Sequence, residues 1–148
     1  MVSDEYSGLT ILKSSKQVYP AGPGQANLET FPNRYPDRDY IIRFNCQEFT
    51  SVCPITGQPD FAQITITYVP NAKCIESKSL KLYLFSYRHA GMFHEEITNR
   101  ILDDVVSACS PRWAQVLGIM NARGGIGIRV LAEFSEPGFK RPSVVSAF

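Results

Sequence analysis

The residues best suited to chemistry lie in one loop, which opens with a cysteine and carries an aspartate seven positions later. Cys53 and Asp60 bound this loop, and its interior contains residues that disfavour regular pairing: Pro54, Gly57 and Pro59. A thiolate is a strong nucleophile, and a carboxyl group can give or take a proton. No histidine lies within the loop to act as the usual base for a thiol. The loop therefore predicts a Cys53/Asp60 catalytic pair; the alternative is a buried thiol and an aspartate that caps a turn.

A second cluster places two lysines at the predicted start of a helix. Lys78 and Lys81 are three residues apart, a spacing that allows both side chains to project to one side of a helix. Together with the unpaired amides of the helix start, such lysines can hold an anionic group such as a phosphate. The alternative is an ordinary solvated helix face.

A third cluster, His94-Glu95-Glu96, lies where a longer helix is predicted to begin. A carboxylate at this place can simply complement the helix dipole. It can also accept two N–H groups from the edge of an amidine-like heterocycle, whose shape a carboxylate matches. No metal site is predicted, because His89 and His94 are five residues apart rather than four and no cysteine is placed to complete a tetrahedral set.

The composition is that of an ordinary globular domain. The 148 residues include 15 basic and 14 acidic side chains, and 44% of them are hydrophobic. A net charge of +1 argues against a protein that binds nucleic acid directly. No segment resembles a secretory signal or a membrane-spanning helix, and four cysteines without a CxxC pair are typical of a cytoplasmic protein. We therefore expect one cytoplasmic domain with neither nucleic acid nor membrane as a partner.

Hydrophobic spacing predicts the elements that must position these clusters. Residues 1–38 are interrupted by proline and glycine, which indicates an N-terminal arm packed on a core of residues 39–148 that ends in a short tail. Within the core, alternation predicts strands and helical periodicity predicts helices. The predicted strands are 39–48, 63–69, 113–122 and 126–133. The predicted helices are 79–87, capped by Ser77, and 93–108.

This order of elements predicts an α+β fold. Four antiparallel strands form one sheet, and two helices cover one of its faces, in the order strand-strand-helix-helix-strand-strand. The edge strands of such a sheet expose unpaired N–H and C=O groups, so we expect a homo-oligomer that buries them. The alternative is a pair of edges blunted by charge and proline.

Several blocks of the sequence together resemble the QueF family, the single-domain NADPH-dependent 7-cyano-7-deazaguanine reductases. The match spans most of residues 28–128. Its blocks are Leu28-Glu29-Thr30-Phe31-Pro32-Asn33, Glu48-Phe49-Thr50, Cys53 to Phe61, Glu76 to Tyr83, Phe93-His94-Glu95 and Arg123-Gly124-Gly125. The block Glu76-Ser77-Lys78-Ser79-Leu80-Lys81 distinguishes this family from its relatives.

The resemblance implies a tunnelling fold, in which subunits pair their sheets around a ring and ligands bind between neighbours. In the single-domain form two pentameric rings stack, so the resemblance implies a homo-oligomer of ten chains. It also implies a reaction, the reduction of the nitrile of 7-cyano-7-deazaguanine to an aminomethyl group on the way to queuosine, a modified tRNA base. NADPH is the implied hydride donor, and no metal is implied.

The resemblance also assigns roles to matching positions. Cys53 is the implied nucleophile, which forms a covalent thioimide with the nitrile carbon, and Asp60 is the implied proton donor. The implied substrate-binding residues are Ile75, Glu76, Ser77, His94 and Glu95. The implied cofactor-binding residues are Lys78, Lys81 and Arg123.

Two other functions agree with part of the sequence. A GTP cyclohydrolase-like enzyme of the same fold would share the purine-anchoring glutamate, but it requires a metal site. A non-catalytic protein that holds a purine or pterin through Glu95 would leave Cys53 and Asp60 without a role. Neither alternative uses the three clusters together.

Overall fold

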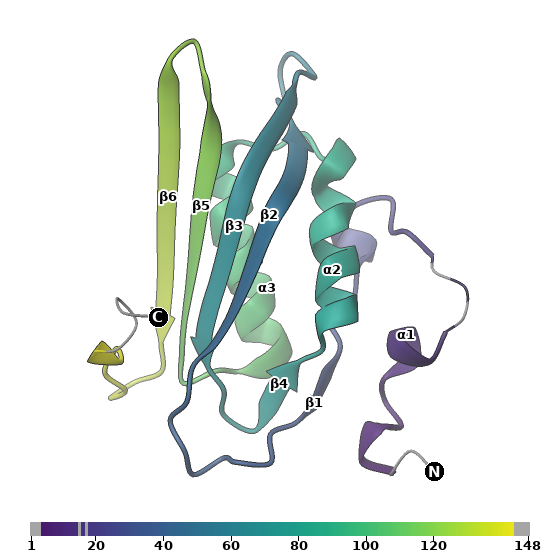
Figure 1. Ribbon diagram of the computed structural model, residues 1–148, viewed down its shortest axis with the longest axis vertical. Coiled ribbons are helices and arrows are strands. Elements are labelled where there is room, and N and C mark those ends of the chain that lie inside the picture. Colours follow the sequence, from purple (N-terminus) through teal and green to yellow (C-terminus); the bar gives the residue numbers. More distant parts are fainter. Residues whose placement is uncertain (1–3, 15, 17, 144–148) are drawn as a thin grey trace.

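A four-stranded antiparallel sheet forms one layer of the molecule, and two helices cover one of its faces (Figure 1). The computed structural model describes residues 4–14, 16 and 18–143. The strand order is β2-β3-β5-β6, and the strands are β2 Ile42–Val52, β3 Pro59–Val69, β5 Trp113–Arg123 and β6 Ile126–Ser135. The helices are α2, Ser77–Phe85, and α3, His94–Cys109. This arrangement confirms the predicted α+β architecture and its order of main elements.

The core lies between the sheet and the helices. Alternate residues of β3, Ile64, Ile66 and Tyr68, are buried on the face that the helices cover, as their period of two predicts. The apolar stripe of α3 packs against the same core: Ile97, Ile101, Leu102 and Val105. Burial of this stripe and of the inner sheet face is the main hydrophobic contribution to folding.

The helix α3 packs tightly against β5 at a glycine. A Cβ atom at Gly118 would lie 2.7 Å from Thr98 Oγ1 and 2.9 Å from Met120 Cε, so a larger residue has no room there. The Thr98 hydroxyl in turn donates to the backbone oxygen of His94 (3.1 Å). This contact therefore fixes the first turn of α3 relative to the sheet.

A second, two-stranded sheet was not predicted. It consists of β1, Thr30–Pro32, paired antiparallel with β4, Lys73–Ile75. The N-terminal segment also contains a one-turn helix, α1, Thr10–Lys13. Short 3-10 segments lie at Asp4–Tyr6, Pro23–Gln25 and Ser86–His89. Three- and four-residue elements are too short to give a periodic pattern, which is why the sequence prediction missed β1, β4 and α1.

The predicted ends of the two strands that flank Cys53 were wrong, because β2 extends to Val52 rather than to about 48 and β3 begins at Pro59 rather than at 63. The connection predicted for 53–61 is shorter, because β3 begins at Pro59 and Asp60 pairs with Ser51 of β2. A proline is tolerated as the first residue of a strand, so Pro59 does not delay pairing. The predicted arm and tail also include residues 1–3, 15, 17 and 144–148, which lie outside the described residues.

Among the residues that the structure describes, no helix has both the length and the apolar character needed to cross a membrane.

Candidate active site

Cys53 follows the last residue of β2 and opens a tight turn that leads into β3. Two backbone hydrogen bonds close this turn: the Cys53 N–H donates to the Gln58 oxygen (2.8 Å), and the Gly57 N–H donates to the Cys53 oxygen (2.9 Å). Gly57 has a φ of +68°, in the left-handed region that glycine adopts without steric cost. The turn leaves Cys53 only 9% exposed in the single chain.

The turn surrounds the Cys53 sulfur with hydrogen-bond donors. The Thr56 hydroxyl contributes most, followed by the backbone N–H groups of Thr56 and Ile55, and the Arg123 side chain adds a smaller contribution. Together these donors lower the pKa of the Cys53 thiol from its ordinary value of 9.0 to about 7. Hydrogen bonds to sulfur favour the thiolate, which is the nucleophilic form. A large share of Cys53 is therefore ready to react near neutral pH.

The other cysteines lie in different surroundings. All four cysteines are free, and Cys74 and Cys109 are buried while Cys46 is half-buried. Burial raises the pKa of the Cys46 thiol, and it raises the pKa of the Cys109 thiol to about 12. Cys46 and Cys109 are therefore kept as neutral thiols, in contrast to Cys53.

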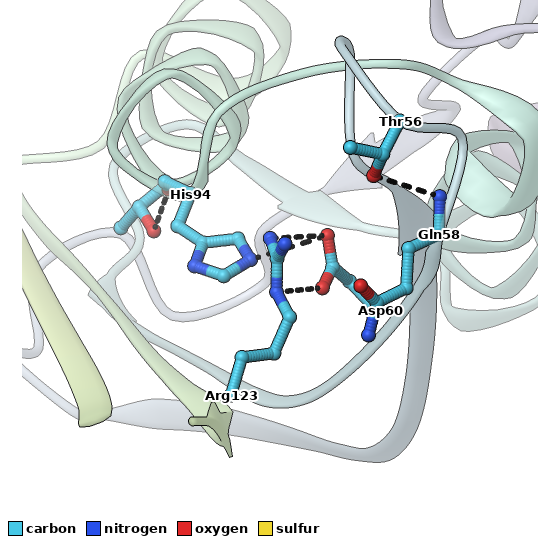
Figure 2. Close-up of polar contacts among 6 residues, drawn as sticks. Thr56, Gln58, Asp60, His94 and Arg123 are labelled. Carbon is cyan, nitrogen blue, oxygen red and sulfur yellow. Dashed lines mark hydrogen bonds and ion pairs between the residues drawn. The ribbon is translucent and has the colours of Figure 1, made fainter. Parts of the chain in front are cut away.

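Two basic side chains contact the carboxylate of Asp60. Arg123 Nε lies 2.9 Å from Asp60 Oδ1, and Arg123 Nη2 lies 3.1 Å from Oδ2, so the guanidinium binds both oxygens. His94 Nε2 lies 3.4 Å from Oδ2. Figure 2 shows both side chains pointing toward Asp60 from different elements. Asp60 and His94 are almost completely buried, whereas Arg123 is partly exposed.

One ring nitrogen of His94, Nε2, has no hydrogen-bond partner among the described residues. This atom is buried and forms no hydrogen bond of good geometry with Asp60, since that contact is long. A buried polar atom without a partner is costly, so a ligand atom beside it would be favoured. Glu95, the next residue of α3, is exposed.

A cleft of about 290 Å³ opens beside this cluster. The residues that line it come from the Cys53 turn, the first turn of α3 and the β5–β6 hairpin: Pro54, Met92, Phe93, His94, Glu95, Asn121, Arg123, Ile126 and Ile128. The structure thus brings together five of the predicted site residues: Cys53, Asp60, His94, Glu95 and Arg123.

The remaining predicted site residues lie elsewhere in the chain. Figure 1 shows α2 beginning near β4, far from the turn that joins β2 to β3. Residues 75–77 line a cavity of about 700 Å³ together with Ile42 and Phe44 at the start of β2. Cys53 stands nine residues after Phe44, roughly 30 Å along a strand that rises about 3.3 Å per residue. Within one chain, the predicted residues therefore form two separate groups.

In the single chain, Glu76 caps the helix α2. Its carboxylate accepts the backbone N–H groups of Lys78 (2.8 Å) and Ser79 (2.7 Å), which satisfies two amides at the helix start. The prediction that Ser77 is the cap was wrong, because Ser77 is itself the first helical residue.

The two lysines do not share a surface. The Lys78 ammonium donates to the backbone oxygens of Ile11 (2.9 Å) and Ser14 (3.3 Å), at the C-terminal end of α1. Lys78 lines a cavity beside the N-terminal segment, and Lys81 lines a different cavity against β2. Figure 1 shows α2 between β2 and α1. The prediction that both lysines project to one side was therefore wrong, because the two cavities lie on different flanks of the helix.

Comparison with known proteins gives the family. A family model described as "QueF-like protein" matches residues 59–138. A protein of Syntrophus aciditrophicus named "NADPH-dependent 7-cyano-7-deazaguanine reductase" is 54% identical over 139 residues, which are 94% of this chain and 95% of that protein. The chain belongs to the QueF-like family. This membership confirms the family predicted from the sequence.

Other QueF-like relatives agree with this assignment. A protein of the same name from Neisseria gonorrhoeae is 46% identical over 136 residues, covering 92% of this chain and 87% of its own length. Among solved structures, the apo crystal structure of the archaeosine synthase QueF-Like superposes with a TM-score of 0.59 and 27% identity. That match covers 63% of this chain and 91% of the other, which confirms the α+β fold across the shared region.

One residue of the QueF-like site was missed by the sequence prediction. Thr56 makes the largest contribution to the lowered pKa of Cys53, yet it was not proposed as a site residue. The available signal was its position three residues after the cysteine, inside a turn that glycine and proline shape. Within residues 4–14, 16 and 18–143, no three His, Cys, Asp or Glu side chains gather as a metal site requires.

Proposed function

We propose that this chain is an NADPH-dependent 7-cyano-7-deazaguanine reductase, which converts a nitrile to an aminomethyl group in the synthesis of queuosine. The observation that carries the proposal is the Cys53 thiol, with a pKa of about 7, in the turn that leads to the buried Asp60. A nitrile is a poor acceptor of hydride, and addition of a thiolate to its carbon gives a more reactive C=N bond. The QueF-like relatives carry the name of this reaction.

The first step uses Cys53 and Asp60 as nucleophile and proton carrier. The Cys53 thiolate forms a bond to the nitrile carbon. One π pair of the C≡N bond moves to nitrogen, which takes up a proton that Asp60 relays from solvent, to give a thioimide. Reduction to the amine then takes four electrons and two protons: two molecules of NADPH supply the electrons as hydrides, and solvent supplies the protons to nitrogen and to the released sulfur. Cys53 leaves as a thiolate when the C–S bond breaks between these hydride transfers.

His94 and Glu95 are suited to hold the heterocycle. The exposed Glu95 carboxylate, at the start of α3, can accept two N–H groups from the guanine-like edge of the substrate. The unsatisfied His94 Nε2 faces the same region and can bind a further polar atom. This placement orients the nitrile toward the Cys53 turn, since Pro54 of that turn lines the same cleft.

We place Ile75, Glu76, Ser77, Lys78 and Lys81 in the same site, contributed by a neighbouring copy of the chain. In one chain Ile75, Glu76 and Ser77 line a cavity at the start of β2, whereas Cys53 follows the end of that strand. Every contributed residue except Lys78 lines a cavity with residues of β2, which is an edge strand of the sheet, and β6 is the other edge. Pairing of β2 with β6 of the next copy would satisfy both edges and close a ring, in keeping with two stacked pentamers. The two lysines then supply cations for the phosphates of NADPH.

The decisive experiment follows the absorbance of reduced nicotinamide after 7-cyano-7-deazaguanine is added to the protein and NADPH. We expect two NADPH to be oxidised per nitrile, and we expect Cys53→Ala to abolish both this oxidation and the covalent adduct detected by mass spectrometry. Tight binding of the heterocycle without NADPH oxidation would instead indicate a purine- or pterin-binding protein. GTP turnover that depends on added zinc would indicate a cyclohydrolase.

A further inference from the structure

We propose that Glu29 is a positioning residue for the substrate, because it holds α1 as one wall of the cavity of about 700 Å³ that residues 75–77 line. Glu29 directly precedes β1 and is almost completely buried. A buried carboxylate needs hydrogen-bond donors around it, and α1 supplies them. The role in substrate binding rests on the proposed function, whereas the contact between Glu29 and α1 does not.

The Glu29 carboxylate caps the start of α1 from a distant part of the sequence. It accepts the backbone N–H groups of Thr10 (3.1 Å) and Ile11 (3.1 and 3.2 Å to its two oxygens), and it also accepts the Thr10 hydroxyl. Leu9, which precedes the helix, makes no side-chain capping bond of its own. A helix of four residues is too short to be stable alone, so α1 depends on contacts with the rest of the chain. Glu29 supplies these contacts at the start of α1.

The backbone of Glu29 is fixed independently of α1. Its N–H donates to the Ser79 hydroxyl (3.0 Å), and its backbone oxygen accepts the Glu76 N–H (2.9 Å). Glu76 belongs to the wall of the cavity that residues 75–77 form, and Ser79 lies in the first turn of α2. Glu29 thus links two walls of the cavity, one through its backbone and the other through its side chain. We therefore expect loss of the side chain to release α1 and to leave residues 75–77 in place.

α1 lies between this cavity and a second cavity of about 390 Å³, which Lys78 lines. The first cavity is lined from the N-terminal segment by Tyr6, Leu9, Leu12 and Lys13, and the second by Thr10, Ile11 and Ser14. Leu9 is buried, whereas Leu12 is 53% exposed. Leu12 is therefore the apolar side chain of α1 that remains open to a ligand in the first cavity. A planar heterocycle placed against it would bury apolar surface of both partners.

The test measures the dissociation constant of 7-cyano-7-deazaguanine by isothermal titration calorimetry in a Cys53→Ala background, in which no thioimide can form. Hydrogen exchange followed by mass spectrometry reports on the amides of residues 9–14 in the same proteins. Glu29→Ala removes the cap, and Glu29→Gln keeps its shape and one acceptor oxygen. Leu12→Ala and Ile11→Ala are a matched pair, because the two side chains are neighbours on α1 and line different cavities.

We expect Glu29→Ala to speed exchange at Thr10 and Ile11 and to raise the dissociation constant about 10-fold, with Glu29→Gln between Glu29→Ala and the parent. Leu12→Ala is expected to raise the dissociation constant about 5-fold, and Ile11→Ala to leave it within about twofold. Because Leu12 is exposed, Leu12→Ala is expected to fold whether or not Glu29→Ala does. Thermal unfolding checks every variant.

Three outcomes would overturn the proposal. Unchanged exchange in a folded Glu29→Ala protein would show that Glu29 does not hold α1. Faster exchange with an unchanged dissociation constant would show that α1 is not part of the substrate site. Equal dissociation constants for Leu12→Ala and Ile11→Ala would show the same.

Failure of the proposed function gives a different result. A Cys53→Ala parent that binds no heterocycle, together with a wild-type protein that oxidises no NADPH, would refute the reductase and with it the role of α1 in substrate binding. If only the role of α1 is wrong, the parent still binds the heterocycle and the wild type still oxidises NADPH.

Discussion

The guanidinium of Arg123 binds both carboxylate oxygens of Asp60, although the two residues are 63 positions apart in the sequence. Arg123 ends β5 and Asp60 is the second residue of β3, so the antiparallel pairing of these two strands brings them together. Arg123 was expected to bind the cofactor. In the single chain it is engaged with the proposed proton carrier, and a cofactor phosphate would have to compete for it.

This contact predicts how an Arg123 variant behaves. Arg123→Lys keeps the positive charge but loses the two-pronged grip on Asp60. We expect kcat to fall about 10-fold with little change in the KM for NADPH, because the variant misplaces a group that acts in the transition state. Steady-state kinetics measures both constants. A raised KM with an unchanged kcat would show instead that Arg123 serves the cofactor.

The pKa of Cys53 predicts an acidic limit to activity. The folded pKa lies below the ordinary value, so the thiolate is present above about pH 7 and is lost as the pH falls through that value. Below the midpoint we expect kcat/KM to fall about ten-fold for each pH unit. A pH–rate profile of the purified protein tests this. A profile that stays flat down to pH 5 would mean that thiolate formation does not limit the reaction.

The separation of the two groups of site residues predicts complementation between copies. Cys53→Ala and the double variant Lys78→Ala/Lys81→Ala are each expected to be inactive alone. After unfolding and joint refolding at equal amounts, about a quarter of randomly formed interfaces combine two intact halves. Activity near a quarter of the wild type is therefore expected. Refolding each variant separately before mixing is the control, and equal activity in both samples would argue against a shared site.

The two lysines of α2 allow a test of whether the contact with α1 holds the N-terminal segment in place, because only Lys78 makes that contact. Lys78 is bound to two carbonyl oxygens at the end of α1, whereas Lys81 lines a cavity against β2. Both Lys78→Met and Lys81→Met are expected to weaken NADPH binding. Only Lys78→Met is expected to speed proteolysis within residues 10–20, because it removes the contact that holds α1. Equal proteolysis of the two variants would show that this contact does not secure the segment.

The close packing at Gly118 predicts how a larger residue there affects stability. Gly118→Ala places a Cβ within 3 Å of Thr98 and Met120, and we expect it to lower the free energy of unfolding by about 1–3 kcal/mol. Gly127→Ala in β6 is the control, because no atom lies within 4 Å of its added Cβ. Urea unfolding measures both variants. Equal stability of the two proteins would show that α3 can move away from β5 at no cost.

Periodic segments were the part of the fold that the sequence predicted well. The alternation in β3 and the four-residue spacing in α3 each repeat over enough residues to identify the element and its buried face. β1 and β4 have three residues each, too few for a pattern, and their pairing joins positions about 40 residues apart. Local spacing was therefore enough to predict the large elements, whereas the small elements depend on tertiary contacts that local spacing does not reveal.

The candidate site, like the fold, could be predicted only in part from the sequence. Cys53 and Asp60 are seven positions apart, so spacing alone was enough to propose them as a pair. The sequence could not show whether Glu76 or Ser77 caps α2, because both side chains can accept a backbone N–H. Which of them does so depends on where the backbone turns into the helix. The grip of Arg123 on Asp60 depends on strand register, which local spacing does not specify.

The close contact at Gly118 also bears on how a reactive inhibitor should be built. α3 rests on β5 without spare room, so a heterocycle bound as proposed at the start of this helix would meet a rigid edge. Cys53, in contrast, sits on a short turn that relies on Gly57 for its shape. We therefore expect selectivity to come from the ring system that meets the helix, while the electrophile that captures the sulfur tolerates changes in length and angle.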